Sequence, residues 1–568
     1  MKENTSVSKQ NVNRMVELAR AHVEAGGLRA AEVYYRMILK DTTPPTSGWE
    51  RLANGEACRF YAARALADGR HGSAADWYQR AVFADPAAID YRIEYVVRVM
   101  LPLGMFKNAK IEATRATKID PLNVDAWRAL AIACAAIGDE EESAAAYDRQ
   151  LELDPKNPLA RIDRSTLAIN VGDYETARRM AEPVLETDKR GEALHTLALI
   201  AYRESRHEDA IELCREAIEA GTQDPEAVRW NMSLALHAIG RYAEGWEMAE
   251  ARGRQRADEP MRLVMNRFVP ATMTREDLDK PCRLHVHQEM GNGDAIAMAR
   301  YLTPLVELGH DVRLETIDSM VDLLAGSFPQ VKVMPRAVDY PSALGIPMFD
   351  RHVPTLSLPY LFGTTVASVP WRGPYVRPDP ILADRYRARL KPTSGRRVGL
   401  AWSSGIRQTG LWISRYGKKK SMHFAELLPL LRTERHIGRQ INSFVSLQVG
   451  PEREQHEGRI ADLLPAKPIW SDTAALIANL DLVVTVDTAV AHLAGAMGKP
   501  VWIMMQKDGS TWHFMCERPG APWNERSPWY PSAKIFRQRE FGTSRWDDVV
   551  ADVAAELRRE DAKLVAAE

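Results

Sequence analysis

A period of 34 residues runs through the first 250 residues of the chain and limits its fold more than any other feature. One phase of the period is marked by glycine, with arginine once in its place, at Gly69, Gly104, Gly138, Gly172, Arg206 and Gly240. A second phase is marked by Asp-Pro pairs, with Asp188-Lys189 in one position, at Asp85-Pro86, Asp120-Pro121, Asp154-Pro155 and Asp224-Pro225. Units of this size bury their apolar faces only by stacking on one another, so the period predicts an array of helical pairs.

Each marker residue has a physical use in such a pair. The glycine permits the tight turn between two helices, and the proline closes a unit before the next helix begins. Gly26-Gly27 and Tyr34-Tyr35 indicate a degenerate first unit, so we expect about seven units in residues 1–251. The pattern resembles the tetratricopeptide (TPR) repeat, which implies a superhelix that binds protein on its concave face. A scaffold or dimerisation arm is the alternative.

The sequence pattern changes after the repeats. Residues 252–280 are a polar connector, and from Cys282 short apolar strands alternate with helices. This alternation predicts parallel sheets. A charged segment at residues 377–395 separates the strands into two groups, so we expect two Rossmann-like lobes, residues 281–390 and 391–568, with a cleft between them. The predicted fold class is α + α/β.

Composition excludes several classes of protein. Lysine plus arginine (75) nearly equal aspartate plus glutamate (76), so nothing indicates nucleic acid or an anionic membrane as a partner. The five cysteines are scattered, which argues against a disulfide framework or a zinc site. No apolar run approaches the roughly 20 residues of a membrane span, and no signal core opens the chain. We therefore expect a cytoplasmic protein.

Ligands of parallel sheets lie at the carboxyl ends of strands, and three such places stand out. In residues 285–302, Gly291 and Gly293 allow close backbone approach, and Asp294 stands where a helix begins. Residues 399–422 contain a strand and a long basic loop. In residues 483–505, a strand ends at Asp487-Thr488, and a helix of small residues follows.

The second half resembles the heptosyltransferase-type glycosyltransferases (family nine) and their TPR-fused relatives. The matching segments are "GNGDAIAMARYL", "FDRHVPTLSLPYLFGTT", "RRVGLAW", "FVSLQVGPE", "DTAALIANLDLVVTVDTAVAHLAGAMGKPVW" and "SPWYPSAKIFRQ". The resemblance implies the two-lobed GT-B fold, a nucleotide-sugar substrate, no cofactor and no metal ion. Asp277-Leu278-Asp279 mimics a metal-binding DxD motif, but it lies in the connector.

The resemblance also implies roles for residues at the strand ends. Asp294 corresponds to the proposed general base of an inverting transfer, and helix capping is its structural alternative. Backbone amides of Thr488, Ala489 and Val490 correspond to the donor-phosphate site. Asp487 is expected to orient amides or to accept from a hydroxyl group. His492 reaches a phosphate or sugar, or else is a buried histidine bonded to a carbonyl group.

Further contacts are expected from the loops of the second lobe. Lys420 is the predicted phosphate-facing cation, and the amides of Ser403, Ser404 and Gly405 are further phosphate contacts. Gln448 lies where relatives approach the nucleoside base. In the unusual segment 506–526, Trp512 and His513 are candidate sugar or acceptor contacts.

Together these features predict a glycosyltransferase that moves a sugar from a nucleotide donor to a protein held by the TPR arm. Flagellin is the acceptor that the resemblance implies, with a nonulosonic acid such as pseudaminic acid as a candidate sugar. Transfer to lipopolysaccharide or another glycan is one alternative. A TPR scaffold with a non-catalytic transferase lobe is the other.

Overall fold

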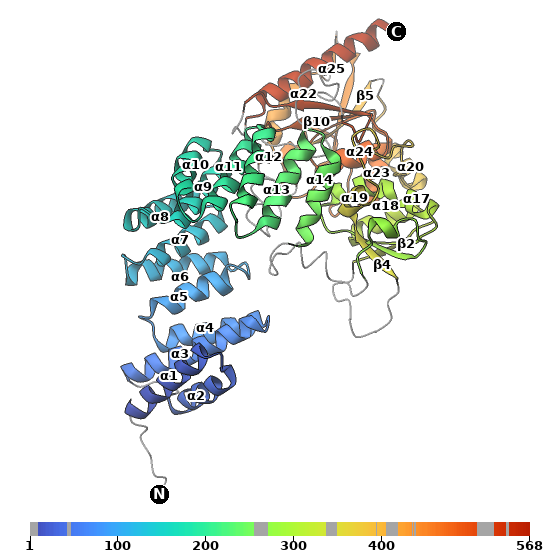
Figure 1. Ribbon diagram of the computed structural model, residues 1–568. Coiled ribbons are helices and arrows are strands. Elements are labelled where there is room, and N and C mark those ends of the chain that lie inside the picture. The colour runs from blue at the N-terminus through green and yellow to red at the C-terminus, as the bar shows by residue number, and fades with distance from the viewer. Residues whose placement is uncertain are drawn as a thin grey trace. The chain divides into compact units, whose positions relative to one another are not determined.

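The computed structural model describes residues 9–42, 47–254, 271–336, 349–393, 395–404, 419–433, 435–436, 439–507, 527–540 and 545–567. The chain forms two compact units: the first extends to Leu167 and the second begins at Ala168. Figure 1 labels helices and strands of both units. This division falls within the repeats and not at the predicted end of the array near residue 251.

The first unit consists of helices that pair in chain order. They are α1 (Lys9–Glu24), α2 (Leu28–Thr42), α3 (Gly48–Ala67), α4 (His71–Ala84), α5 (Ile89–Tyr95) with the π-helical turn η1 (Val96–Met100), α6 (Phe106–Ile119), α7 (Val124–Ile137), α8 (Glu140–Leu153) and the start of α9 (Pro158–Val171). Alanines of the repeat, such as Ala81, Ala109 and Ala113, are fully buried, which allows the paired helices to approach closely.

The turn glycines have the left-handed conformation that the repeat pattern requires. Gly69, Gly104, Gly138, Gly172 and Gly240 have φ angles between 71° and 87°. The exception is the unit marked by Arg206. Helix α11 (Arg190–Arg203) ends early enough that Ser205, with φ 58°, takes the left-handed position. The predicted turn position is therefore wrong by one residue in this unit.

The second unit begins with the remaining repeats. After α9 come α10 (Tyr174–Ala181), η2 (Glu182–Glu186), α11, α12 (His207–Glu219), α13 (Pro225–Ala238), α14 (Tyr242–Ala249) and η3 (Glu250–Gly253). Tyr242, Trp246 and Ala249 of α14 belong to the same buried core as the strands that follow. The last repeat therefore folds together with the α/β part of the chain.

The first lobe is built on a parallel sheet in the order β3-β2-β1-β4. Its strands are β1 (Arg283–His287), β2 (Asp311–Thr316), β3 (Lys332–Pro335) and β4 (Arg351–Pro354). Its helices are η4 (Arg275–Asp277), α16 (Asn292–Met298), η5 (Ala299–Tyr301), α17 (Leu302–Glu307), α18 (Asp318–Ser327), η7 (Thr355–Ser357) and α19 (Leu358–Leu361). Leu284 and Val286 alternate along β1 into the shared core.

The second lobe is built on a parallel sheet in the order β11-β10-β9-β5-β8. Its strands are β5 (Arg396–Ala401), β8 (Asn442–Ser446), β9 (Leu482–Val486), β10 (Val501–Met505) and β11 (Ala533–Arg537); β6 (Arg435–His436) and β7 (Arg439–Gln440) form a separate two-stranded ladder. Its helices are η8 (Phe424–Leu427), α22 (Leu428–Leu431), η9 (Pro451–His456), α23 (Trp470–Ala478), α24 (Ala489–Ala496) and α25 (Asp547–Ala567). Helix α20 (Pro380–Arg389) comes before the predicted boundary at residue 390 but packs against α23 of this lobe.

Helical repeats followed by two parallel sheets confirm the predicted α + α/β class. None of the helices in the described ranges is both long and apolar enough to cross a bilayer.

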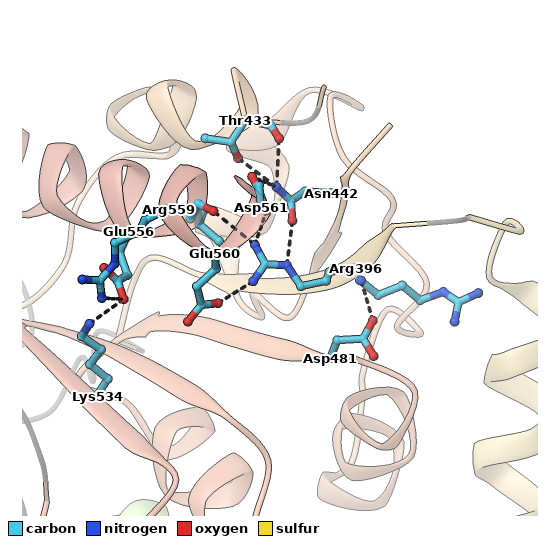
Figure 2. Close-up of polar contacts among 11 residues, drawn as sticks. Arg396, Thr433, Asn442, Asp481, Lys534, Glu556, Arg559, Glu560 and Asp561 are labelled. Atoms are coloured by element: carbon cyan, nitrogen blue, oxygen red, sulfur yellow. Dashed lines mark hydrogen bonds and ion pairs between the residues drawn. The ribbon is translucent and has the colours of Figure 1, made fainter. Parts of the chain in front are cut away.

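A buried polar cluster attaches helix α25 to the second sheet (Figure 2). Arg396, at the start of β5, donates to Glu560 and Asp561 of the helix and to Oδ1 of Asn442 (3.2 Å). Nδ2 of Asn442 donates to Oδ2 of Asp561 (3.0 Å) and to the carbonyl of Thr433 (2.9 Å). Asp561 is 1% exposed, so its charge depends on donors supplied by the protein, such as those of Arg396 and Asn442.

We predict that Asp561→Asn lowers the free energy of unfolding of the second unit by about 2 kcal/mol, because an amide N–H would then face the donors of Arg396 or Asn442. Glu560→Gln is the matched control: its side chain is 39% exposed, and the expected loss is below about 1 kcal/mol. Denaturant unfolding followed by tryptophan fluorescence measures both values. Equal losses in the two variants would contradict the assigned role of Asp561.

Candidate functional site

Helix α16, which follows β1 in the first lobe, packs against helix α24, which follows β9 in the second lobe. Gly293 of α16 lies close to His492 of α24, since a Cβ atom at residue 293 would lie 2.5 Å from Cδ2 of His492. The sequence predicted that this glycine lets a ligand approach the backbone. In the structure, it is the His492 ring that approaches Gly293.

Asp294 is the third residue of α16, and its carboxylate accepts a hydrogen bond from the Gly291 amide (3.0 Å). This contact closes the first turn of the helix, so the capping role considered for Asp294 is present. The side chain is half-buried. A carboxylate has several acceptor positions, so the cap contact leaves room for a second role.

The helix that follows β9 is capped by its own threonine. Thr488 is the N-cap residue of α24, and its Oγ1 accepts from the Val490 amide (3.2 Å) and lies 3.1 Å from Oγ1 of Thr485. The Val490 amide, one of the three predicted phosphate donors, is therefore bonded within the cap. A phosphate contact from the amides of Thr488 and Ala489 stays a prediction.

An ion pair lies at the start of this helix. Nζ of Lys420 is 3.4 Å from Oδ2 of Asp487, and the two side chains are 20% and 8% exposed. Both residues are candidates for the donor site from the sequence, but the sequence did not predict that they form an ion pair. Because Lys420 compensates the charge of Asp487, an anion at this helix end does not meet an unpaired carboxylate.

The end of strand β5 is braced by side chains. Oε1 of Gln448 accepts from the amides of Trp402 and Ser403 (both 2.9 Å), and its Nε2 donates to the carbonyls of Ser403 (3.1 Å) and Val449 (2.9 Å). The buried Gln448 amide group thus holds the protein backbone, whereas the sequence associated it with a nucleoside base.

The backbone of Ser404 is likewise bonded to a protein side chain. Its amide donates to Oγ of Ser421 (3.0 Å), a residue to which the sequence assigned no role. In this conformation the amides of Ser403 and Ser404 are bonded to protein acceptors, and their contact with a phosphate stays a prediction. Gly405, Trp512 and His513 lie outside the described residues.

His492 is buried, and its Nδ1 lies 2.9 Å from the hydroxyl of Tyr530. Burial lowers the pKa of His492 to about 4, so the imidazole is neutral at physiological pH. The structural alternative considered for His492 was a bond to a carbonyl group, and here a phenol takes that place. Tyr530 is a functional-site neighbour that the sequence indicated only through the "SPWYPS" motif.

Arg300 of the first lobe is buried and contacts residues of the second lobe. Its guanidinium donates to the carbonyl of Trp529 (3.0 Å) and the hydroxyl of Tyr375 (3.1 Å). It also lies 4.6 Å from the ring centroid of Trp529 and 5.1 Å from that of Tyr530. Nε1 of Trp529 in turn donates to the hydroxyl of Tyr242 in the last repeat (3.0 Å). We call these five residues the Arg300 cluster.

Metal ligation is not indicated by the residues that the structure describes. Among them, no group of three or more His, Cys, Asp or Glu side chains is arranged to hold a metal ion.

We predict that Gly293→Ala destabilises the second unit by about 1–3 kcal/mol, because the new methyl group would overlap the His492 ring. Gly326→Ala in α18 is the matched control, since a Cβ there meets nothing within 4 Å, and the melting temperature should stay or rise slightly. Differential scanning calorimetry of both variants is the measurement. A Gly293→Ala protein as stable as the wild type would contradict the close contact.

Two family models match the chain. The tetratricopeptide repeat model matches residues 107–158 and 162–225. The model described as glycosyltransferase family 9 (heptosyltransferase) matches residues 452–503, which include Asp487, Thr488 and His492.

Similar proteins are known for most of the chain and for the repeats. Protein FlbA of Caulobacter vibrioides is 27% identical over 470 residues, which cover 77% of this chain and 73% of FlbA. The TPR repeat-containing protein YpiA of Bacillus subtilis is 24% identical over 189 residues, 33% of this chain and 43% of YpiA. Among solved structures, TTC0263, a thermophilic TPR protein of Thermus thermophilus, has a TM-score of 0.29 and 17% identity, covering 32% of this chain and 98% of its own. The chain therefore contains tetratricopeptide repeats and a glycosyltransferase family 9 domain, which supports its assignment as a glycosyltransferase.

Proposed function

We propose that the chain transfers a sugar from a nucleotide-activated donor to hydroxyl groups of a protein that its repeats bind. The observation that carries the proposal is the contact between Gly293 and His492. Through it, the carboxylate of Asp294 and the Lys420–Asp487 pair belong to one region at the carboxyl ends of β1 and β9. The family 9 match over residues 452–503 supports the same region as the donor site.

In the proposed reaction, the Asp294 carboxylate takes the proton of an acceptor hydroxyl as its oxygen attacks the anomeric carbon. The bond from that carbon to the donor phosphate breaks, and the configuration at the carbon is inverted. Lys420 and the amino-terminal end of α24, with the Thr488 and Ala489 amides, stabilise the charge that develops on the leaving phosphate. The proposed chemistry thus uses protein groups in place of a metal ion.

The repeats are the proposed acceptor-binding part. Most of the exposed large apolar side chains of the described residues lie before residue 172, and among them Phe83 is 82% and Leu122 69% exposed. These side chains are the apolar groups of the repeats that a bound protein would cover. A bound acceptor presents its hydroxyl groups at a raised local concentration.

Flagellin is the first acceptor to test, because TPR-fused relatives that the sequence resembles modify it. A nonulosonic acid such as pseudaminic acid is the matching candidate sugar, and the cytoplasm is the proposed location. The heptosyltransferase description of the matched family favours transfer to lipopolysaccharide or another glycan as the second candidate.

We predict that Asp294→Asn reduces transfer by about 10²–10⁴-fold, because the amide can still accept from Gly291 but cannot take a proton. Asp472→Asn is the matched control: Asp472 is also the third residue of a helix, α23, and accepts from the amide of Ile469 (3.1 Å). The intact mass of flagellin from cells that carry each variant is the measurement.

Three results would contradict parts of this proposal. Flagellin modified equally by Asp294→Asn and wild-type protein would remove Asp294 from the reaction. A changed glycan or lipopolysaccharide with unmodified protein would favour the second candidate. Retained cellular function of Asp294→Asn, without any transfer, would indicate a scaffold.

We predict that Lys420→Met weakens nucleotide binding about tenfold or more, because Asp487 then lies uncompensated beside the phosphate. Calorimetric titration with UDP, ADP, GDP and CMP identifies the nucleotide and then measures the change. Lys534→Met is the matched control, since Lys534 pairs with Glu556 (2.8 Å) on another part of the second lobe.

A double variant separates two effects of Lys420→Met: the loss of the attraction between lysine and phosphate, and the repulsion between phosphate and the uncompensated Asp487 carboxylate. In Lys420→Met/Asp487→Asn the carboxylate charge is also removed, so binding should recover in part but stay below that of the wild type. Unchanged affinity in the Lys420→Met variant would exclude Lys420 from the donor site.

A further inference from the structure

We propose that Tyr530 is a positioning residue of the transfer site: its hydroxyl donates to Nδ1 of His492, fixes the imidazole in the Nε2–H form and holds the ring against the glycine turn at Gly293. The proposal rests on the proposed function for what the N–H does, but the geometry of the three residues stands independently of it.

Tyr530 is held against helix α24 on one face of the helix. A Cβ at Gly495 would lie 2.5 Å from Cγ of Tyr530, so only glycine admits the ring there. Gly495 and His492 are three residues apart and therefore share a helix face, which the Tyr530 ring covers. Both Tyr530 and His492 are buried, so the phenol has little freedom to leave the imidazole.

The direction of the hydrogen bond follows from the charges of the two groups. Burial lowers the pKa of His492 to about 4 and raises the pKa of Tyr530 well above its ordinary value, so both groups are neutral. A single proton therefore lies between the Tyr530 oxygen and Nδ1 of His492, and it is bonded to one of these two atoms. An imidazole nitrogen is a stronger acceptor than a phenol oxygen, which places that proton on Tyr530.

Arg300 also favours donation from the Tyr530 hydroxyl to Nδ1 of His492. Its guanidinium lies 5.1 Å from the Tyr530 ring centroid, and a cation over the ring makes the phenol a better donor. Arg300 also donates to the hydroxyl of Tyr375 (3.1 Å), a second phenol beside Tyr530. With Nδ1 of His492 as acceptor, the imidazole proton resides on Nε2.

The Cδ2 edge of the ring, with Nε2 next to it, lies against the first lobe: a Cβ at Gly293 would lie 2.5 Å from Cδ2. A Cβ at Gly293 would lie 3.2 Å from Nε2, so the N–H lies beside the residue that precedes Asp294. Asp487 and Lys420 are the charged groups of the second lobe that act on the ring, and Arg300 acts on it from the first. The arrangement supplies a neutral donor for an oxygen of the sugar or of the leaving phosphate.

The first test is spectroscopic and uses the full chain with ¹⁵N-labelled histidine. His492→Gln identifies the His492 resonances by their loss. In the wild type, Nδ1 should have the shift of an unprotonated, hydrogen-bonded nitrogen and Nε2 that of a protonated one. In Tyr530→Phe, the Nδ1 resonance should move, because its donor is gone. A protonated Nδ1 in the wild type, or unchanged shifts in Tyr530→Phe, would overturn the proposal.

Tyr301→Phe is the matched control for loss of a buried phenol. The Tyr301 hydroxyl is bonded to Oγ1 of Thr364 (2.7 Å), away from His492, and its removal should leave the His492 resonances in place. A shift of those resonances in Tyr301→Phe equal to that in Tyr530→Phe would indicate general loosening of the fold and overturn the specific role of Tyr530.

The second test is kinetic. Tyr530→Phe should lower kcat roughly tenfold with KM for nucleotide sugar and acceptor little changed, since the oriented N–H serves the charge that develops during transfer. An unchanged kcat with an altered tautomer would overturn the positioning role. If the wild type transfers no sugar at all, the proposed function fails, whereas the resonances still decide whether Tyr530 sets the tautomer.

Discussion

The second unit depends on one buried cation, the guanidinium of Arg300. A charge this deep in the protein is tolerated only when its donors have partners. In Arg300 the donors bond to carbonyls of Ala297 (2.9 Å), Pro370 (3.3 Å) and Trp529 and to the Tyr375 hydroxyl, and aromatic rings lie against it. Because these partners belong to both lobes, any large displacement of one lobe would leave part of the charge unsatisfied.

The same cluster makes the last repeat a part of the transferase. Trp529 donates to Tyr242, and a second buried contact runs from Arg252 to Oε1 of Glu289 (2.9 Å) and Oγ of Ser357 (2.8 Å). Glu289 stands two residues before Gly291. Burial raises its pKa to about 7, and the pairing with Arg252 acts in the opposite direction, in favour of the charged form. Removing the chain up to residue 253 would take away Arg252 and the Tyr242 partner of Trp529 and would expose core. The last repeat and the sheets therefore form one folding unit.

Periodicity predicted the fold well because helical pairs and parallel strands are specified locally. The turn glycines and strand ends follow from spacing alone, and even the error at Arg206 is a single residue, since Ser205 adopts the left-handed turn. Bracing contacts could not be predicted in this way. Gln448 bonds to residues 45 and 46 positions earlier, and Arg300 bonds to a carbonyl 229 positions later. Such pairs depend on how separate strands and lobes pack, which no local pattern contains.

Charge at the candidate site is nearly balanced before a ligand binds. Lys420 faces Asp487, and burial keeps His492 neutral. An imidazolium ion at this place would attract an anionic product as strongly as a developing negative charge, and it would slow release. A fixed neutral N–H, together with the amino-terminal end of α24, responds most to charge that appears during transfer, in a site of low dielectric constant. On the proposed function, a neutral N–H of the buried His492 thus favours the transition state over the bound donor, whose leaving oxygen does not yet carry the developing charge.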